Sequence, residues 1–573
     1  MAALSLFEIK DLTYYYPGSG LPALKNINLQ IEEGELLLVM GGSGSGKSSL
    51  ARVLSGLIPA FYGGRFGGKV LFRGKELSAL PRRVLGEEVG LVFQDPEKQL
   101  VMTTVEAEIA FGPENLRLPQ KEMFRRVAGV MGFLNLTPLK DKFTGNLSGG
   151  EKQKVALAAV LAMQPRVLIL DEPTSQLDPV AAGKFFDLIE RLNREMGYTV
   201  ILIEQRLERC FHLADRLALM EQGEIRRIGP PDEVARWEVE HSFPFIPPVA
   251  KFFASLDTPF IPLTVKEGRK ELKNLFSRPP ASGNNRIGPS CAPAVITGKT
   301  QPYRQPCREI VEVKNVWFTY PNGTEALKGV NLRIAEGEFV VVLGENAAGK
   351  STLLKLMVGL LKPGRGRVAL LGTDTRSVSP VALARHIGYL SQNPNDYLFQ
   401  DTVEGELRFT LSNLRLEDNG AIDTLLEKLE LTTLRYANPR DLSSGERQRA
   451  ALASVLVAQP EFVVLDEPTR GIDCRLKERL GEFLRALAKE GAGVVVATHD
   501  VEFTAEYAGR VIMLFDGRIV SDGPKGEVLG NSPFYAPQMA KLFRGFADDV
   551  LTVREGIERI SLDGDSRYAS RAK

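Results

Sequence analysis

Positions 41–48 read Gly41-Gly42-Ser43-Gly44-Ser45-Gly46-Lys47-Ser48, directly after the apolar run Leu36-Leu37-Leu38-Val39-Met40. An apolar run that ends at a glycine-rich turn is typical of a buried parallel strand. Glycines let backbone N–H groups close around a phosphate, and the start of the following helix adds a favourable dipole. Lys47 supplies positive charge to the phosphate oxygens, and Ser48 offers a hydroxyl to Mg²⁺. The stretch therefore predicts a phosphate-binding loop (P-loop) in an α/β fold.

The same pattern returns about 300 residues later. Positions 344–351 read Gly344-Glu345-Asn346-Ala347-Ala348-Gly349-Lys350-Ser351, again after an apolar run, at 339–343. Other landmarks recur in the same order, as the pairs Gln94 and Gln392, Ser148 and Ser443, and Asp171 and Asp466. Two P-loop patterns at matching places in the repeat are very unlikely to arise by chance. The sequence therefore indicates a tandem duplication.

The repeat also sets the expected domain bounds. Elements at 244–268 are echoed at 533–556, so each module carries its own C-terminal appendage. Residues 277–306 have no counterpart and are rich in Pro, Gly, Ser and Asn, which predicts a flexible linker; an ordered loop is the alternative. We therefore expect a first module at 1–276 and a second at 307–573. Within each module, apolar strands alternate with helical stretches such as 122–134, which predicts a mostly parallel sheet.

The composition of the chain argues against several classes of protein. The 573 residues carry 72 Lys plus Arg against 71 Asp plus Glu, so no positive field would attract nucleic acid. The four cysteines show no CxxC spacing, which favours a reducing compartment and no structural metal site. No apolar stretch reaches the roughly 18 to 20 residues of a spanning helix, so we do not expect the chain to cross a membrane.

Two strands are expected to end in paired carboxylates. Apolar runs at 167–170 and 462–465 lead into Asp171-Glu172-Pro173 and Asp466-Glu467-Pro468. Because successive side chains of an extended strand point to opposite faces, the two acids of each pair should have different roles. Asp171 and Asp466 are placed for the Mg²⁺ shell, and Glu172 and Glu467 for polarising the attacking water.

Two further motifs accompany each P-loop. Ser148-Gly149-Gly150 and Ser443-Ser444-Gly445 each open an apolar helix, with Ser148 and Ser443 as expected N-caps. Upstream, Tyr16 and Tyr320 stand where a ring face could stack on adenine, although tyrosines before a proline can equally pack the end of a strand.

Together, the P-loop, a glutamine (Gln94, Gln392), the LSGGE-type helix start, the Asp-Glu-Pro strand end and a closing histidine resemble the nucleotide-binding domains of ATP-binding cassette (ABC) proteins. The resemblance implies two tandem P-loop cassettes, each with a helical subdomain, that pair head to tail so that each ATP lies between one P-loop and the other module's signature helix. ATP contacts are then expected from both P-loops, from Ser49 and Thr352 directly after them, and from Tyr16, Tyr320, Gln94, Gln392, Ser148, Gly149, Gly150, Ser443, Ser444 and Gly445. The Mg²⁺ ligands are expected to be Ser48, Gln94, Asp171, Ser351, Gln392 and Asp466.

The two sites are not expected to be equal. His499 stands where the family has its γ-phosphate switch, and Gln205 takes that place in the first module. Glutamine cannot carry a proton or a positive charge, so it is a poorer partner for a γ-phosphate that gains charge. The site with Lys47 and Gln205 would also use the altered Ser443-Ser444-Gly445 signature. We expect the site with Lys350 and His499 to turn over faster, unless Glu172 keeps the first site active regardless.

The run Phe111-Gly112-Pro113-Glu114-Asn115 and the paired appendages are similar to ATPases of energy-coupling factor importers, which take up vitamins, cobalt or nickel. This resemblance implies an integral-membrane scaffold subunit and a small substrate-binding membrane subunit as partners, at the cytoplasmic face of the membrane. A thiamine-like vitamin or precursor is the expected cargo, ahead of a metal ion. A fused monosaccharide-importer ATPase and a soluble tandem-cassette translation factor are the alternatives.

Overall fold

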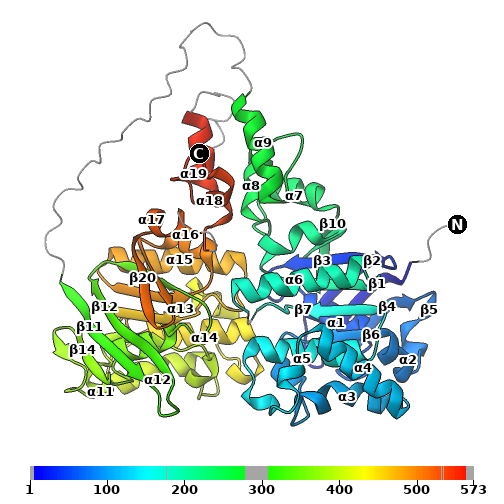
Figure 1. Cartoon of the computed structure of the whole chain (residues 1–573), viewed down its shortest axis with the longest axis horizontal. Helices are drawn as coiled ribbons and strands as arrows, with labels where there is room; N and C mark the ends of the chain where they lie inside the picture. Colours follow the sequence, from blue (N-terminus) through cyan, green and yellow to red (C-terminus); the bar gives the residue numbers. More distant parts are fainter. Residues whose placement is uncertain (1–4, 176, 278–307, 531, 533–534, 563–573) are drawn as a thin grey trace, which may run out of the picture. The chain divides into compact units, whose positions relative to one another are not determined.

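The computed structural model describes residues 5–175, 177–277, 308–530, 532 and 535–562 (Figure 1). It divides into two compact units. Of the described residues, unit 1 comprises those within 5–254, 258–263 and 470–475, and unit 2 comprises those within 255–257, 264–469 and 476–562. The expected linker at 277–306 lies outside the described residues, apart from residue 277.

Unit 1 is built on two sheets. The first has the order β2 (Leu24–Ile31), β1 (Phe7–Tyr15), β4 (Arg65–Phe72) and β5 (Lys75–Glu76). The second has the order β10 (Glu224–Gly229), β9 (Arg216–Glu221), β3 (Leu36–Gly41), β8 (Thr199–Ile203), β7 (Val167–Asp171) and β6 (Val89–Val92). In the second sheet, only β10 runs antiparallel to its neighbour.

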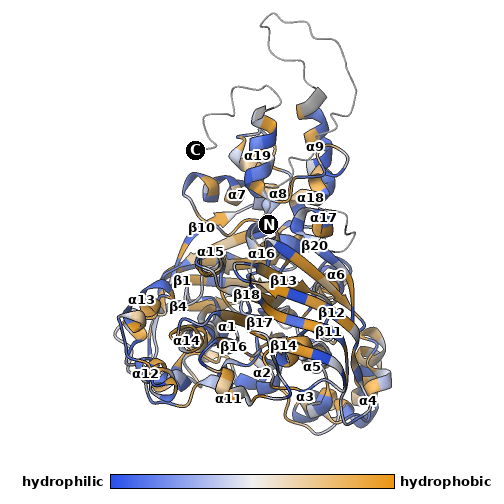
Figure 2. Ribbon diagram, turned by 90° about the vertical axis from the view of Figure 1, so that its left-hand side faces the viewer, coloured by the Kyte–Doolittle hydropathy of each residue, from blue (hydrophilic) through white to orange (hydrophobic). Residues whose placement is uncertain are grey.

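Unit 2 repeats this plan. One sheet has the order β12 (Glu325–Ala335), β11 (Glu309–Thr319), β14 (Arg365–Leu370) and β15 (Thr373–Asp374). The other has the order β16 (Ile387–Leu390), β17 (Phe462–Asp466), β18 (Gly493–Thr498), β13 (Phe339–Leu343), β19 (Arg510–Phe515) and β20 (Arg518–Pro524). Figure 2 shows β13, β17 and β18 in the hydrophobic colour, and every residue of these strands is buried. Parallel strands covered on both faces need such continuous apolar runs.

Helices connect the strands in both units. The described helices of unit 1 are α1 (Lys47–Leu54), α2 (Arg82–Glu88), α3 (Val105–Asn115), α4 (Gln120–Phe133), α5 (Gly149–Ala162), α6 (Pro179–Arg194), α7 (Pro231–Glu240) and α8 (Pro248–Ser255, whose last residue belongs to unit 2). Those of unit 2 are α9 (Val265–Ser277), α10 (Lys350–Met357), α11 (Pro380–Leu383), α12 (Val403–Leu414), α13 (Ala421–Lys428), α14 (Ser444–Leu456), α15 (Cys474–Lys489, whose first two residues belong to unit 1), α16 (Val501–Tyr507), α17 (Lys525–Gly530), α18 (Gln538–Phe543) and α19 (Val553–Leu562). In unit 1, α3, α4 and α5 gather at one end and α7 and α8 at the other (Figure 1).

Each unit includes a short segment from the other half of the sequence. Unit 1 takes in residues 470–475, where Arg475 pairs with Glu221 at 3.0 Å. Unit 2 takes in α9, whose Arg269 donates to the backbone carbonyls of Lys541 (3.2 Å) and Arg544 (2.9 Å). The sequence predicted that the residues of α9 belong to the first module, whereas in the structure they belong to unit 2. The bounds of the two modules stay a prediction.

No described helix combines the length and the apolar character that a membrane span requires.

A buried carboxyl group in α7 makes the stability of unit 1 sensitive to pH. Glu238 is fully buried, accepts a hydrogen bond from the Phe245 N–H at 2.9 Å, and has a second oxygen without a partner. Burial raises the pKa of Glu238 from 4.5 to about 8. The folded chain therefore holds a proton that the unfolded chain releases, and the stability of unit 1 should fall between pH 4.5 and 8, by up to about 1.4 kcal/mol per pH unit.

Glu238→Gln is expected to remove this loss, because the amide oxygen still accepts from Phe245 while the side chain has no charge to form. The variant should unfold at a higher temperature than the wild type at pH 8.5 and at nearly the same temperature at pH 5. Calorimetry at both values tests this, with Glu240→Gln, an exposed position on the same helix, as the control. An equal difference at both pH values contradicts the prediction.

Candidate nucleotide-binding sites

The fold brings the predicted site residues to one edge of each large sheet. In unit 1, neighbouring strands β6, β7, β8 and β3 lead into Gln94, Glu172, Gln205 and the first P-loop. In unit 2, β16, β17, β18 and β13 lead into Gln392, Glu467, His499 and the second P-loop. Because the carboxyl ends of parallel strands meet at the same edge, residues far apart in sequence become neighbours.

Both P-loop lysines are buried and fold back over their own loop. Lys47 donates to the carbonyls of Gly41 (2.8 Å) and Gly42 (2.7 Å), and Lys350 donates to those of Gly344 (2.8 Å) and Glu345 (3.0 Å). Burial lowers the pKa of the Lys47 ammonium, whereas the nearby carboxylates oppose that shift. The charge of each lysine is thus held within its loop, where a phosphate would need it.

Close backbone neighbours leave no room for a side chain at the first glycine of each loop, Gly41 or Gly344, or at the last. Gly46 (φ 99°) and Gly349 (φ 101°) precede α1 and α10, and a Cβ there would lie 2.6 Å from the Ala23 oxygen and 2.5 Å from the Ala326 oxygen. Gly44, at φ 73°, has open space around it, and its counterpart Ala347 already has a side chain at φ 64°.

The tyrosines bind the helix that follows each P-loop. The hydroxyl of Tyr16 lies 3.1 Å from the Ser49 hydroxyl, and that of Tyr320 lies 3.0 Å from the Thr352 hydroxyl. Arg52 also donates to the Tyr16 hydroxyl at 2.8 Å. The hydroxyl groups are thus held on α1 and α10, and stacking of either ring on adenine stays a prediction.

Each expected Mg²⁺ pair of hydroxyl and carboxylate is assembled. Ser48 donates to Asp171 at 3.1 Å, and Ser351 donates to Asp466. Burial raises the pKa of both aspartates, that of Asp466 to about 6. Among the residues that the structure describes, no group of three or more His, Cys, Asp or Glu side chains could hold a metal ion by itself. Hydroxyl and carboxylate oxygens are ligands that Mg²⁺ takes in proteins, and Mg²⁺ at these pairs stays a prediction.

In unit 1, two amides converge on Glu172. Gln94 donates to its Oε2 at 2.7 Å and Gln205 to its Oε1 at 2.6 Å. The carboxyl group is buried, and this burial raises the pKa of Glu172 to about 7. Both oxygens of Glu172 are therefore already engaged by neutral donors.

In unit 2, the surroundings of Glu467 are different. His499 Nδ1 lies 2.8 Å from Glu467 Oε2, and the Thr498 hydroxyl donates to the same oxygen at 3.2 Å. His499 is buried, and its Nε2 has no hydrogen-bond partner among the described residues. Gln392 is exposed and, unlike Gln94, its side chain makes no hydrogen bond within the described part of the chain.

The family model described as ABC transporter matches residues 24–175 and 327–470, which together exceed half of the chain. The chain belongs to the ABC transporter family. An ABC transporter ATP-binding protein of Methanosarcina acetivorans is 38% identical over 538 residues, covering 91% of this chain and 86% of the relative. One of Streptomyces coelicolor is 37% identical over 553 residues, covering 94% and 97%. Among solved structures, cbiO1 from Clostridium perfringens, described as part of the ABC transporter complex cbiONQ, is 35% identical and covers 42% of this chain and 94% of that chain, with a TM-score of 0.37.

The protein is therefore a two-cassette ABC ATPase, and the predicted fold of two tandem P-loop cassettes with mostly parallel sheets is confirmed. The signature helices also begin as predicted. Ser148 caps α5 and Ser443 caps α14, each in a capping box with the glutamate three residues later. The signature of each ABC cassette thus opens a helix whose N-terminal N–H groups favour anions.

One part of the sequence argument was wrong. Glu172 and Glu467 do not continue their strands, because both have left-handed backbones, with φ 47° and 53°. Their N–H groups bind the carbonyls of Ile203 (2.9 Å) and Ala497 (2.8 Å) on the neighbouring strand. It is this turn, and not strand alternation, that separates the role of each glutamate from that of the aspartate before it. Such strained positions cluster at functional sites.

Sequence reasoning missed two carboxylates next to the first ABC site. Glu204 is buried directly before Gln205, at the end of β8. Asp473, in the segment 470–475 of unit 1, accepts a hydrogen bond from the P-loop N–H of Ser43 at 2.7 Å. An acidic residue at the end of an apolar strand was a readable signal for Glu204. Nothing in the sequence around Asp473 indicated its distant partner.

Proposed function

We propose that this ATPase energises an importer of the energy-coupling factor type from the cytoplasmic face of the membrane. The proposed cargo is a vitamin or vitamin precursor of the thiamine type, with cobalt or nickel ions as the second candidate. The run 111–115 in α3 supports this subgroup. Its Gly112 lets α3 approach α5, because a Cβ there would lie 2.7 Å from Met163.

The observation that carries the proposal of a membrane partner is a pair of exposed apolar side chains at matching positions in each unit, which we interpret as a docking surface. In unit 1 it consists of Val101 and Phe111, which are 62% and 38% exposed. In unit 2 it consists of Phe399 and Phe409, which occupy the same positions relative to Gln392 and are 62% and 42% exposed. Large apolar side chains repeated at matching exposed positions favour a protein partner.

Hydrogen bonds connect each docking surface to the loop that follows Gln94 or Gln392 at the edge of the large sheet. In unit 1, the buried carboxylate of Glu108 accepts the N–H groups of Val101 (2.9 Å) and Met102 (2.6 Å), which fixes the loop after Gln94 on α3. In unit 2, Glu406 accepts the Gln400 N–H in the same way. A partner that moves this loop would therefore change the distance between Gln94 and Glu172.

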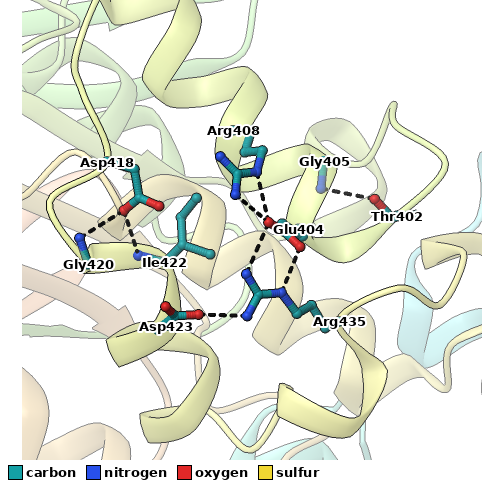
Figure 3. A network of polar contacts seen from close by, with 9 residues as sticks. All are labelled: Thr402, Glu404, Gly405, Arg408, Asp418, Gly420, Ile422, Asp423 and Arg435. Atoms are coloured by element: carbon teal, nitrogen blue, oxygen red, sulfur yellow. Dashed lines mark hydrogen bonds and ion pairs between the residues drawn. The ribbon is translucent and has the colours of Figure 1, made fainter.

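The helices that carry the two docking surfaces are held by different ion pairs. In unit 2, Glu404 on α12 receives hydrogen bonds from Arg408 and Arg435, and Arg435 also pairs with Asp423 on α13 (Figure 3). These arginines hold the pKa of Glu404 low, at about 2. In unit 1 the corresponding place has the single pair Glu106 and Lys140, at 3.0 Å. The difference supports an asymmetric pair of contacts on the membrane scaffold.

Hydrolysis follows from the groups at each sheet edge. Water attacks the γ-phosphorus, the bond to the oxygen that bridges the β- and γ-phosphates breaks, and ADP leaves. Glu172 or Glu467 polarises the water, and Lys47 or Lys350 binds the phosphate oxygens. The oxygen pairs of Ser48 with Asp171 and Ser351 with Asp466 suit Mg²⁺, which when bound neutralises phosphate charge. His499, whose Nδ1 faces Glu467, would present its Nε2 to the γ-phosphate.

Two further parts of the proposal concern the pairing of the modules. Each ATP is bound by the P-loop of one module and the signature helix of the other, in a head-to-tail arrangement. The site with Lys350 and His499 then hydrolyses ATP faster than the site with Lys47 and Gln205. The two amides on Glu172, in contrast to the imidazole on Glu467, support this inequality.

The role of the docking surfaces can be tested by replacing one of their apolar side chains with aspartate. Val101→Asp and Phe399→Asp should each abolish co-purification with the membrane scaffold, because a charge at the centre of an apolar interface typically costs about 2 kcal/mol or more, or roughly 30-fold in affinity. The tagged chain is purified from solubilised membranes, bound integral-membrane subunits are identified by mass, and their stimulation of ATP hydrolysis is measured.

Met196→Asp and Phe515→Asp are matched controls, since these side chains are 56% and 57% exposed but lie outside both docking surfaces. Controls that lose the partner as well would contradict the assignment of the surface. Recovery of a small, very apolar substrate-binding subunit supports the energy-coupling type. A large permease with its own sugar specificity favours the monosaccharide alternative, and stimulation by ribosomes instead of membranes favours a translation factor.

A further inference from the structure

Glu204 joins two loops of the first site. One carboxylate oxygen accepts the N–H and the hydroxyl of Thr174, at 3.0 and 2.5 Å. The other accepts the N–H groups of Gln205 (3.1 Å) and Arg206 (3.4 Å). Thr174 follows Glu172 by two residues, so this one buried side chain fixes the loop that carries Glu172 against the loop that carries Gln205.

Unit 2 connects the same two loops by different chemistry. The position before His499 is Thr498, whose hydroxyl lies 3.3 Å from that of Thr469, the counterpart of Thr174. Thr498 also accepts the N–H of Asp500 at 3.1 Å and donates to Glu467 at 3.2 Å. A carboxylate accepts only, whereas a hydroxyl both accepts and donates. Both oxygens of Glu204 already accept hydrogen bonds from Thr174, Gln205 and Arg206, whereas the Thr498 hydroxyl also donates to Glu467.

We propose that Glu204 is a positioning residue of the first site, which holds Gln205 on Glu172, and that Glu204-Gln205 and Thr498-His499 are alternative matched pairs. The four hydrogen bonds to Glu204 set where the Gln205 backbone lies, and Gln205 then reaches Glu172 at 2.6 Å. Charged acceptors make strong hydrogen bonds, and leaving a buried N–H without one is costly.

If the two pairs are matched, Glu204→Gln should lower ATP turnover more than Glu204→Thr does, although glutamine has nearly the same shape as glutamate. In Glu204→Gln, one carboxylate oxygen becomes an NH₂ group, so the side chain can accept from the backbone of only one of the two loops. In Glu204→Thr, the hydroxyl can face Thr174 as Thr498 faces Thr469, although the side chain is smaller. A residue that only filled space would show the opposite order.

The test measures steady-state ATP hydrolysis by the full chain with Glu467→Gln in place, so that turnover at Glu172 dominates. Adding Glu204→Gln is expected to lower kcat about 10- to 100-fold, the range for residues that orient a reacting group, with KM for ATP unchanged. Glu204→Thr with Gln205→His is expected to raise kcat above that of the parent by at least about tenfold, and Gln205→His alone to give less than a quarter of that gain. The reciprocal Thr498→Glu, in a chain with Glu172→Gln, should lower kcat by a similar 10- to 100-fold factor.

The inference is overturned if Glu204→Gln leaves kcat within twofold, or if Gln205→His alone gives the whole gain. A rise in KM with unchanged kcat also overturns it, because it indicates a role in binding only. The inference rests on the proposed role of Glu172. If Glu172→Gln changes nothing in the Glu467→Gln chain, that proposed role fails, whereas a large effect of Glu172→Gln beside a silent Glu204→Gln rejects the positioning role alone. Thermal unfolding of each variant distinguishes misfolding from loss of positioning, and Glu204→Thr is the rescue variant if Glu204→Gln unfolds.

Discussion

Replacement of Glu467 by glutamine is expected to lower ATP turnover of the whole chain about 10²-fold, the size typical of losing a positioned general base. Glu172→Gln is expected to lower it less than twofold. The reason lies in what each carboxylate touches. Glu467 has an imidazole at 2.8 Å that can carry a proton, whereas both oxygens of Glu172 are occupied by the uncharged amides of Gln94 and Gln205.

Steady-state phosphate release from the purified chain measures this difference, and binding of a non-hydrolysable ATP analogue is its control. Both substitutions keep the shape of the side chain, so each variant should still bind two nucleotides. Equal losses of turnover in the two variants would reject the inequality of the sites and favour the alternative that Glu172 works without a histidine.

The sequence predicted the positions of the chemical groups better than their contacts. Apolar runs that end at glycine or at an acidic pair became β3, β7, β13 and β17, because strands buried on both faces leave few other choices. Ser148 and Ser443 were predictable as helix caps, since the capping box needs only residues three apart.

Contacts between distant segments could not be predicted in this way. The left-handed backbone of Glu172 depends on a carbonyl at Ile203, and the two amides on its carboxylate come from positions 94 and 205. No local pattern shows how far Gln392 lies from Glu467, although Gln94 and Gln392 stand at equal places in the repeat. The repeat predicts equivalent positions, and the side chains around each position determine whether a contact forms.

Gly349→Ala is expected to abolish nucleotide binding at the second P-loop and to lower total ATP turnover about as much as Glu467→Gln does. A Cβ at this position would lie 2.5 Å from the backbone oxygen of Ala326 and 3.0 Å from the Leu327 side chain, at a backbone φ of 101°. An L side chain rarely adopts this conformation, and a backbone oxygen cannot move aside as a flexible side chain can. The start of α10 would have to shift, which takes Lys350 and Ser351 away from the phosphate.

The chain itself provides the matched control for this prediction. Gly44 has φ 73° and nothing within 4 Å of its Cβ position, and Ala347 shows that alanine fits the corresponding place at φ 64°. Gly44→Ala should therefore bind ATP like the parent, whereas Gly46→Ala should lose binding at the first P-loop through a contact of 2.6 Å with the Ala23 oxygen. Titration with a fluorescent ATP analogue counts the sites directly: one for Gly349→Ala or Gly46→Ala, and two for Gly44→Ala. Two sites in Gly349→Ala would mean that the loop tolerates a side chain there, and the close approach of Ala326 would then have no role in shaping the phosphate site.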